Sequence, residues 1–177
     1  MAVVVNLVGD VRLRPLRLDD EGDALAAHSE LAADDFEFLL SHDSDRSWSE
    51  HISALERHRH GIDLPEGFVP ATFLAITLKD QLVGRVSIRH HLNDFLAREG
   101  GHVGYGIRPA FRRRGVATEA LRQSLVIARS VGVDHVLVTC DDTNDASSAV
   151  IEVCGGVLES VIEVDDGSGR LRRYWIR

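Results

Sequence analysis

The sequence predicts an α/β domain in which helices flank a mixed sheet, and three observations lead to this prediction. Short runs rich in apolar and β-branched residues, typical of strands, recur along the chain. They alternate with helical segments in the order strand, two helices, three strands, helix, strand, helix and two strands. No internal repeat or linker is visible, so residues 1–177 are expected to form a single domain.

The first third of the chain is expected to form one strand and two helices. Residues 11–18 alternate apolar and basic side chains, which is the period of a half-buried strand. Acidic residues follow where a helix N-terminus favours them, and a helix is expected through Leu25 and Leu31. Ser47 stands three residues before Glu50, the spacing of a capping box, so a second helix is expected to begin there.

The middle of the chain is expected to form three strands. Residues 61–70 contain two prolines and two glycines, which indicates a loop. Residues 71–78 and 82–89 flank a three-residue connection, which suits a hairpin. After a further connection, residues 102–107 form a short strand that ends just before a proline.

The last third is expected to alternate helices and strands. Residues 115–131 place apolar side chains on one helical face, and the glycine that follows them ends the helix. Residues 135–140 are typical of a buried strand, and residues 146–154 of a short helix. The two closing strands are expected at residues 157–164 and 171–176.

Composition and charge exclude several classes of protein. The net charge of -8 argues against a broad nucleic-acid-binding surface, because neutralising phosphates needs a basic footprint. No stretch approaches the roughly 20 apolar residues that span a bilayer, so no membrane partner is expected. Residues 1–6 lack the basic region of a secretory signal, and the cysteines Cys140 and Cys154 make no disulfide framework. A reduced, cytoplasmic protein is therefore expected.

The segment with the clearest chemistry joins the strand at residues 102–107 to the long helix. It carries Arg112, Arg113, Arg114 and then Gly115. The free N–H groups and the dipole of a helix start favour an anion, and a glycine lets phosphate oxygens reach the backbone. The alternative is a solvated basic turn that only begins the helix.

The spacing of this segment resembles the signature of a known family. Arg112-x-x-Gly115-x-Ala117 resembles the Q/R-x-x-G-x-G/A signature of the GNAT acetyltransferase superfamily. The resemblance implies that the backbone amides of this turn bind the pyrophosphate of acetyl-CoA. The cofactor-binding residues that it implies here are Arg112, Arg113, Arg114, Gly115, Val116, Ala117 and Thr118.

A second segment extends the resemblance. Residues 144–156 resemble the element N-x-x-S-x-x-V-I-E-x-x-G-G/F, which follows the fifth strand in many GNAT enzymes. By this resemblance Asn144 contacts the pantetheine arm or a nearby backbone group, and Ser147 lies beside the coenzyme sulfur. Helix capping is the simpler role for both residues. Further stretches resemble a bacterial subgroup of predicted GNAT acetyltransferases without an agreed substrate, at residues 69–72, 84–94, 100–109 and 172–176.

The resemblance implies a fold and a reaction. The fold is the GNAT fold, a mixed twisted sheet with flanking helices that is splayed between strands 4 and 5, where acetyl-CoA binds. The reaction is direct attack of a primary amine, on a small molecule or peptide, on the acetyl thioester. The alternatives are a coenzyme-A-binding sensor without turnover and an acyltransferase for another acyl group. Homodimers are common in the family.

Direct attack needs a polarised carbonyl and a base for the amine. The resemblance places the polarising N–H on the strand before the turn, and the candidate is the amide of Ile107. Many relatives carry a glutamate where this chain has His102, so His102 is a candidate base. Glu99 is the alternative base, acting through water, and a purely structural role for His102 remains open.

The acid that protonates the departing thiolate is less well defined. Many GNAT enzymes place a tyrosine seven residues after the asparagine, and here that position is Ile151. Ser147, Tyr105, Tyr174 and water are the alternatives.

The acceptor side offers weaker signals. His90 and His91 precede Asn93 and Asp94, but no further ligand stands nearby at a metal-binding spacing, so no metal is expected. Asn93 and Asp94 are instead candidates for contacts with a cationic amine. Acidic residues in the segment that shapes the acceptor side, Asp34, Asp35, Asp43 and Asp45, favour such an acceptor weakly.

Overall fold

The computed structural model describes residues 7–177, and it confirms each expected helix and strand in its place. The strands are β1 (Val11–Arg14), β2 (Ala71–Leu78), β3 (Gln81–Arg89), β4 (Val103–Ile107), β5 (Val136–Asp141), β6 (Val157–Glu163) and β7 (Arg170–Ile176). The α-helices of this part of the chain are α1 (Glu21–Ala32), α2 (Trp48–Arg59), α3 (Val116–Ser130) and α4 (Asp145–Val153). Within residues 7–177, no helix combines the length and the apolar character needed to cross a bilayer.

Two local differences from the expected elements have physical reasons. β1 ends at Arg14 rather than at residue 18, since Pro15 has no N–H to donate to a neighbouring strand. The connection before β4 contains a π-helical turn, Leu96–Gly100, which Gly101 ends with a φ of 64°. Residues 1–6, on which the expected absence of a secretory signal depends, lie outside the described residues.

The strands form two sheets, and the expected splay lies between them. One sheet has the order β1-β2-β3-β4 and the other β5-β7-β6, and each hydrogen-bonded pair in them is antiparallel. At one end β4 meets β5, where the N–H of His102 donates to the carbonyl of Leu137 over 2.7 Å. Beyond this point no ladder joins the two strands in residues 7–177. The predicted splay between strands 4 and 5 is therefore the place where the two sheets part.

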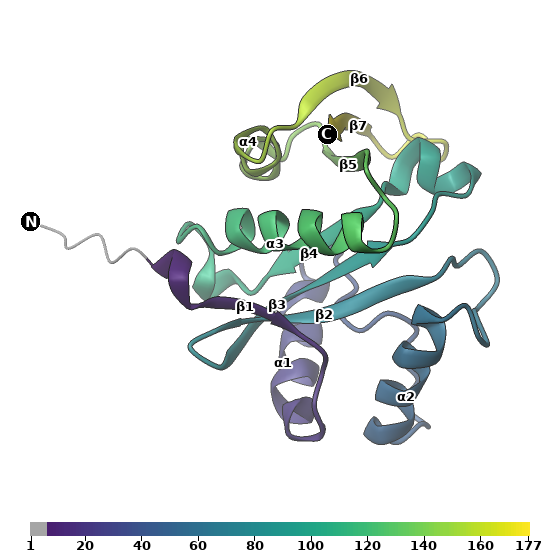
Figure 1. The fold of residues 1–177 in the computed structure, drawn as a ribbon, viewed down its shortest axis with the longest axis vertical. Helices are drawn as coiled ribbons and strands as arrows, with labels where there is room; N and C mark the ends of the chain where they lie inside the picture. The colour runs from purple at the N-terminus through teal and green to yellow at the C-terminus, as the bar shows by residue number, and fades with distance from the viewer. Residues whose placement is uncertain (1–6) are drawn as a thin grey trace, which may run out of the picture.

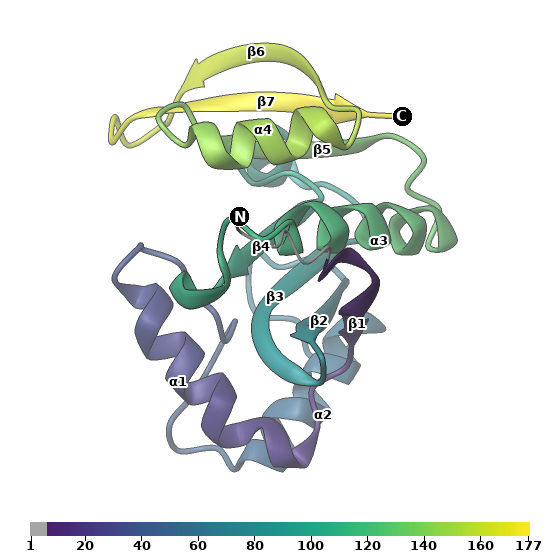
Figure 2. The ribbon, with the colours of Figure 1, turned by 90° about the vertical axis from the view of Figure 1, so that its left-hand side faces the viewer.

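Helices cover both faces of the four-stranded sheet (Figures 1 and 2). α3 packs on one face, and Leu121 and Leu125 join Val86 and Ile88 in one core cluster. α1 and α2 pack on the other face, in a second cluster that includes Phe38. Because both faces are covered, β2 and β3 are buried along almost their whole length.

A buried arginine joins the segment after α1 to the sheet. The guanidinium of Arg85 on β3 donates to the carbonyls of Glu37 (2.6 Å), Phe38 (3.2 Å) and Gly104 on β4 (3.1 Å). It also lies 4.2 Å from the centre of the Phe36 ring. Burial lowers the pKa of Arg85 to about 9. These contacts hold the segment of residues 36–38 against β3 and β4.

The packing of α2 predicts sensitivity to acid. His51 is 5% exposed, its Nε2 has no hydrogen-bond partner, and its ring lies 5.7 Å from that of His42. Burial, and then the charge of a protonated His42, lower the pKa of His51 to about 4. The unfolded chain takes up this proton near pH 6.5. Stability is therefore fully present above about pH 6.5 and decreases towards pH 4.

We expect protonation of His51 to lower the free energy of unfolding by up to about 3 kcal/mol between pH 6.5 and pH 4. Urea unfolding at a series of pH values measures this decrease. A His51→Phe variant should lose part of the acid dependence, whereas His60→Gln, at an exposed site, should keep all of it. Equal acid dependence in the wild type and His51→Phe would contradict the assignment.

Candidate functional site

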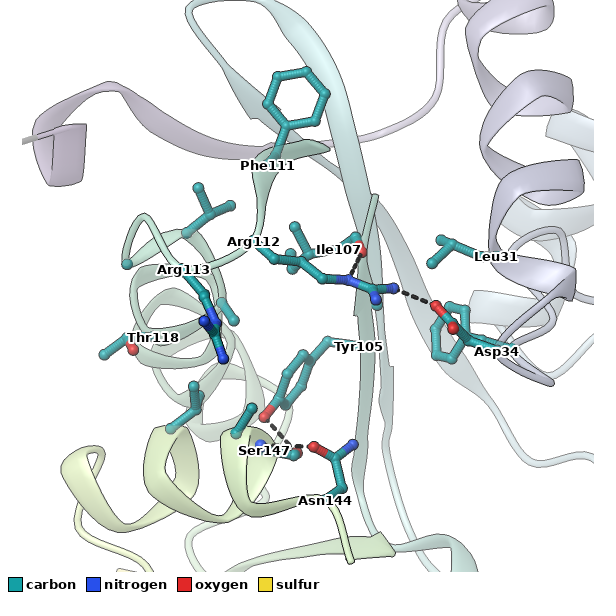
Figure 3. A pocket seen from close by; sticks show the side chains of 17 residues that line it. Leu31, Asp34, Tyr105, Ile107, Phe111, Arg112, Arg113, Thr118, Asn144 and Ser147 are labelled. Atoms are coloured by element: carbon teal, nitrogen blue, oxygen red, sulfur yellow. Dashed lines mark hydrogen bonds and ion pairs between the residues drawn. The ribbon is translucent and has the colours of Figure 1, made fainter. Parts of the chain in front are cut away.

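A cavity of about 610 Å³ lies where the splay meets the start of α3 (Figure 3). Its walls come from the end of α1 and the segment after it, from β4, from the turn before α3 and from the start of α4. The lining residues are Leu31, Asp34, Phe36, Tyr105, Gly106, Ile107, Phe111, Arg112, Arg113, Gly115, Val116, Ala117, Thr118, Asn144, Ala146, Ser147 and Val150. Most of the cofactor-binding residues expected from the sequence therefore meet in one place.

The start of α3 presents unpaired N–H groups to this cavity. Gly115 precedes the helix with a φ of 76°, a left-handed conformation that favours glycine. Arg113 also has a positive φ, of 59°. The N–H groups of residues 116–118 have no acceptor within residues 7–177, as expected for the first turn of a helix. This end of the cavity is suited to a phosphate group.

The three arginines of the turn lie in different places. Arg112 extends along the cavity wall, where its Nε donates to the carbonyl of Ile107 (2.8 Å) and its Nη2 to Asp34 (2.5 Å). Arg113 also lines the cavity. Arg114 was expected to bind the cofactor, but its guanidinium lies 5.8 Å from the ring centre of Phe111 and outside the lining.

A tyrosine and a serine meet at the other end of the cavity (Figure 3). The hydroxyls of Tyr105 on β4 and Ser147 on α4 lie 2.9 Å apart. Asn144 caps α4, since its Oδ1 accepts from the N–H of Ser147 over 3.0 Å. Burial raises the pKa of Tyr105 to about 12, although the hydrogen bond with Ser147 opposes this shift. The Tyr105 hydroxyl therefore keeps its proton throughout the physiological pH range.

Backbone N–H groups of β4 line the space between these two ends. The N–H of Arg108 donates to the carbonyl of Val83, and the N–H of Arg89 to the carbonyl of His102, both over 2.8 Å. In an antiparallel ladder every second residue bonds to the same neighbour. The N–H groups of Tyr105 and Ile107 therefore point away from β3 and into the splay, as the expected role of Ile107 requires.

The two expected bases lie outside the lining of the cavity. His102 is 7% exposed, and its Nδ1 accepts from the N–H of Leu137 over 2.9 Å. Burial lowers the pKa of His102 to about 4. A carboxylate oxygen of Glu99 accepts from the N–H of Asp165 in the β6–β7 turn over 2.9 Å. Both side chains hold separate parts of the fold together, so the geometry favours the structural role for His102 that was left open.

Two substitutions of His102 distinguish a catalytic base from a structural residue. We expect His102→Asn to keep near-normal turnover and stability, because the asparagine Oδ1 can still accept from Leu137. His102→Ala, which leaves that N–H without an acceptor, should lower the free energy of unfolding by about 1–3 kcal/mol. Steady-state kinetics and urea unfolding of both variants measure this. A loss of turnover of a hundredfold or more in a stable His102→Asn protein would instead identify a base.

The expected acceptor contacts also lie outside the cavity lining. Asn93 donates to the carbonyl of Gly67 and accepts from the N–H of Leu96, both over 2.9 Å, so its side chain joins the loop before β2 to the start of the π-helical turn. Asp94 does not line the cavity. The neighbouring His90 is hydrogen-bonded to Thr72 over 2.9 Å. Within residues 7–177, no group of three or more His, Cys, Asp or Glu side chains is arranged to hold a metal ion.

On one wall of the cavity, sequence reasoning named Asp34 by its charge but missed Leu31 and Phe36. Leu31 lies in the last turn of α1, and Asp34 and Phe36 lie in the segment after it, which the sequence marks only by its negative charge. The ring of Phe36 lies directly on β4, where an added Cβ at Gly106 would come within 2.4 Å of it. This contact joins residues 70 positions apart, so no local pattern reveals it.

The comparisons with known proteins agree with this geometry. A family model described as an acetyltransferase (GNAT) domain matches residues 10–157. No protein with a curated description matches the sequence.

Solved structures share the fold. The microcin C7 self-immunity acetyltransferase MccE, in complex with acetyl-CoA and AMP, is 19% identical with a TM-score of 0.64, covering 94% of this chain and 92% of its own. RimJ from Mycobacterium smegmatis, in complex with a coenzyme A disulfide, is 24% identical with a TM-score of 0.66, covering 94% and 81%. A chimera of spermidine N-acetyltransferase SpeG from Vibrio cholerae and hSSAT is 17% identical with a TM-score of 0.61, covering 94% of this chain and 95% of its own.

Proposed function

The chain belongs to the GNAT family of acetyl-CoA-dependent N-acetyltransferases, and we propose that its acceptor is a primary amine of a small molecule or peptide. One observation supports this proposal above the others. A single cavity combines unpaired amides at the start of α3 with the protonated hydroxyl of Tyr105, and outward-facing N–H groups of β4 line the space between them. These features match the needs of a diphosphate, a leaving thiolate and a polarised carbonyl.

In this proposal the residues of the chain act in sequence on one thioester. The start of α3 and Arg113 hold the pyrophosphate, and the N–H of Ile107 polarises the acetyl carbonyl. The ammonium group of the acceptor loses one proton to water before the attack, and it loses a second as its nitrogen bonds to the carbonyl carbon and the carbon–sulfur bond breaks. Tyr105 then donates its proton to the thiolate and recovers one from solvent through Ser147.

Tyr105 takes the role of a residue that this chain lacks on α4. The family position for the acid is Ile151, which is completely buried in the core. The hydroxyl reaches the same end of the cavity from β4 instead, held by Ser147 of α4. We therefore choose Tyr105 as the acid and Ser147 as its hydrogen-bond partner, and we do not retain His102 or Glu99 as the base.

Two measurements test the proposed function. Calorimetric titration with acetyl-CoA is expected to show saturable binding, and a panel of primary amines should then release free thiol in an acceptor-dependent way. Saturable binding without thiol release from any amine would favour the coenzyme-A-binding sensor. Comparing acetyl-CoA with longer acyl thioesters identifies the acyl group. We also expect the protein to act in the cytoplasm as a single domain, and homodimers are common in its family.

A further inference from the structure

The cavity contains one carboxylate, and it is paired with the arginine that opens the pyrophosphate turn. Among the lining residues Asp34 alone carries a carboxyl group, and its Oδ2 accepts from Nη2 of Arg112 over 2.5 Å (Figure 3). The side chains of Asp34 and Arg112 are 45% and 43% exposed, so the pair is open to exchange with solvent and solutes.

We propose that Asp34 holds the ammonium group of the acceptor, and that Arg112 is its internal counter-ion until the coenzyme pyrophosphate takes over the guanidinium. This inference rests on the proposed function. It assigns to the acceptor a positive charge beside an apolar group, and it requires coenzyme binding to favour acceptor binding.

The position of Asp34 suits an acceptor that must reach the acetyl carbon. The Arg112 guanidinium contacts both Asp34 and the Ile107 carbonyl, so one planar group spans the gap between the carboxylate and β4. An ammonium bound at Asp34 therefore lies beside the strand whose N–H groups face the splay. Leu31 and Phe36 flank Asp34 in the lining and offer apolar surface to the rest of the acceptor.

The exchange of partners follows from charge. Guanidinium groups form strong, forked hydrogen bonds with phosphate, and the unpaired amides of α3 hold the pyrophosphate next to Arg112. When Arg112 turns to the phosphate, Asp34 is left as an unpaired carboxylate in a partly enclosed cavity and attracts a cation. By linkage, a bound cation at Asp34 favours the coenzyme to the same degree.

A second ion pair provides a matched control. Glu30 and Arg108 join the same helix end to the same turn through two hydrogen bonds of 3.0 Å and 2.6 Å. The two pairs have the same separation along the chain, 78 residues. Neither Glu30 nor Arg108 lines the cavity. Removing the Glu30 charge therefore measures what an ion pair between these two segments contributes to the structure, without changing the lining of the cavity.

The experiment uses the full chain, with Asp34→Asn, Asp34→Glu and Glu30→Gln as variants. Coenzyme A is titrated into each protein by calorimetry. Phenethylamine is then titrated into the protein with and without saturating coenzyme A, and the neutral 3-phenylpropan-1-ol serves as an uncharged control. Phenethylamine presents an ammonium to Asp34 and an aromatic ring to Leu31 and Phe36, and coenzyme A prevents turnover.

The expected effects have opposite signs for the two ligands. Asp34→Asn frees Arg112 and should bind coenzyme A about threefold more tightly, the effect of a partly exposed ion pair. The same variant should bind phenethylamine about tenfold more weakly, because a charged hydrogen bond is lost. Asp34→Glu should restore most of both affinities. Glu30→Gln should bind both ligands with wild-type affinity. Coenzyme A should strengthen phenethylamine binding only in proteins that have an aspartate or a glutamate at position 34.

Other results would overturn the inference. Weaker coenzyme binding in both Asp34→Asn and Glu30→Gln would show that the Asp34–Arg112 ion pair only stabilises the structure of the site. Equal binding of phenethylamine and the neutral alcohol would show that Asp34 holds no ammonium. The same conclusion would follow if the coenzyme-bound wild type did not bind phenethylamine at about 10 mM. Failure of the wild type to bind coenzyme A would instead contradict the proposed function.

Discussion

A Gly115→Glu protein is expected to lose at least about a hundredfold in affinity for acetyl-CoA. Gly115 has a φ of 76°, and a side chain in this conformation strains the turn by about 1–2 kcal/mol. The added carboxylate also stands where the amides of α3 would hold a pyrophosphate, and like charges at such a contact cost several kcal/mol. The charge repulsion alone is expected to exceed about 3 kcal/mol, or two factors of ten in affinity, whereas the strain is the same with and without coenzyme and lowers only the stability.

Gly132 at the other end of the same helix supplies the control for this substitution. It has a φ of 88°, and a Cβ added there meets no atom within 4 Å. Gly132→Glu should therefore show a similar loss of stability but normal coenzyme binding. Calorimetric titration, with thermal unfolding of both proteins, measures the two effects. Wild-type affinity in a folded Gly115→Glu protein would show that the start of α3 is not the anion site.

A Tyr105→Phe protein is expected to bind acetyl-CoA normally and to lose about a hundredfold or more in kcat. The substitution keeps the ring and removes the hydroxyl that lies 2.9 Å from Ser147. Loss of a positioned general acid costs about 10²–10⁴ in rate. Because burial raises the pKa of Tyr105 to about 12, the wild-type rate should show no decline from ionisation of this group below about pH 10.

Tyr174 provides a closely matched control for Tyr105. Its hydroxyl lies 2.6 Å from Ser148, the next residue along α4, and 3.1 Å from Glu152. Tyr174 is 1% exposed and does not line the cavity. Tyr174→Phe should lower the free energy of unfolding by about 1 kcal/mol and leave kcat unchanged. Equal losses of kcat in the two variants, or none in Tyr105→Phe, would remove Tyr105 from the mechanism.

The acceptor side shows why charge along the sequence is a weak guide to specificity. Four aspartates between α1 and α2 favoured a cationic acceptor before the fold was known. In the structure Asp43 pairs with Arg46 over 3.4 Å, within its own loop. Asp34 alone among the four lines the cavity, and there it is paired with Arg112. The preference for a cationic acceptor therefore depends on Asp34 and on its position in the cavity.

The order of helices and strands, the glycine turn before α3 and the cap of α4 were all determined by the sequence itself. Each depends on residues that are close in the chain. Periodicity sets the buried face of α3, Gly115 supplies a left-handed turn before it, and Asn144 lies three residues before the N–H that it caps. Such local preferences hold wherever the segment is placed in the fold.

Only the tertiary structure decided which side chains meet. Tyr105 reaches Ser147 across 42 residues, and Arg112 reaches Asp34 across 78. His102 was an open choice between base and structural residue, and its hydrogen bond to the N–H of Leu137 favours the structural role. These pairings depend on how the elements pack, because a side chain interacts through space with whatever the fold brings within a few ångströms of it.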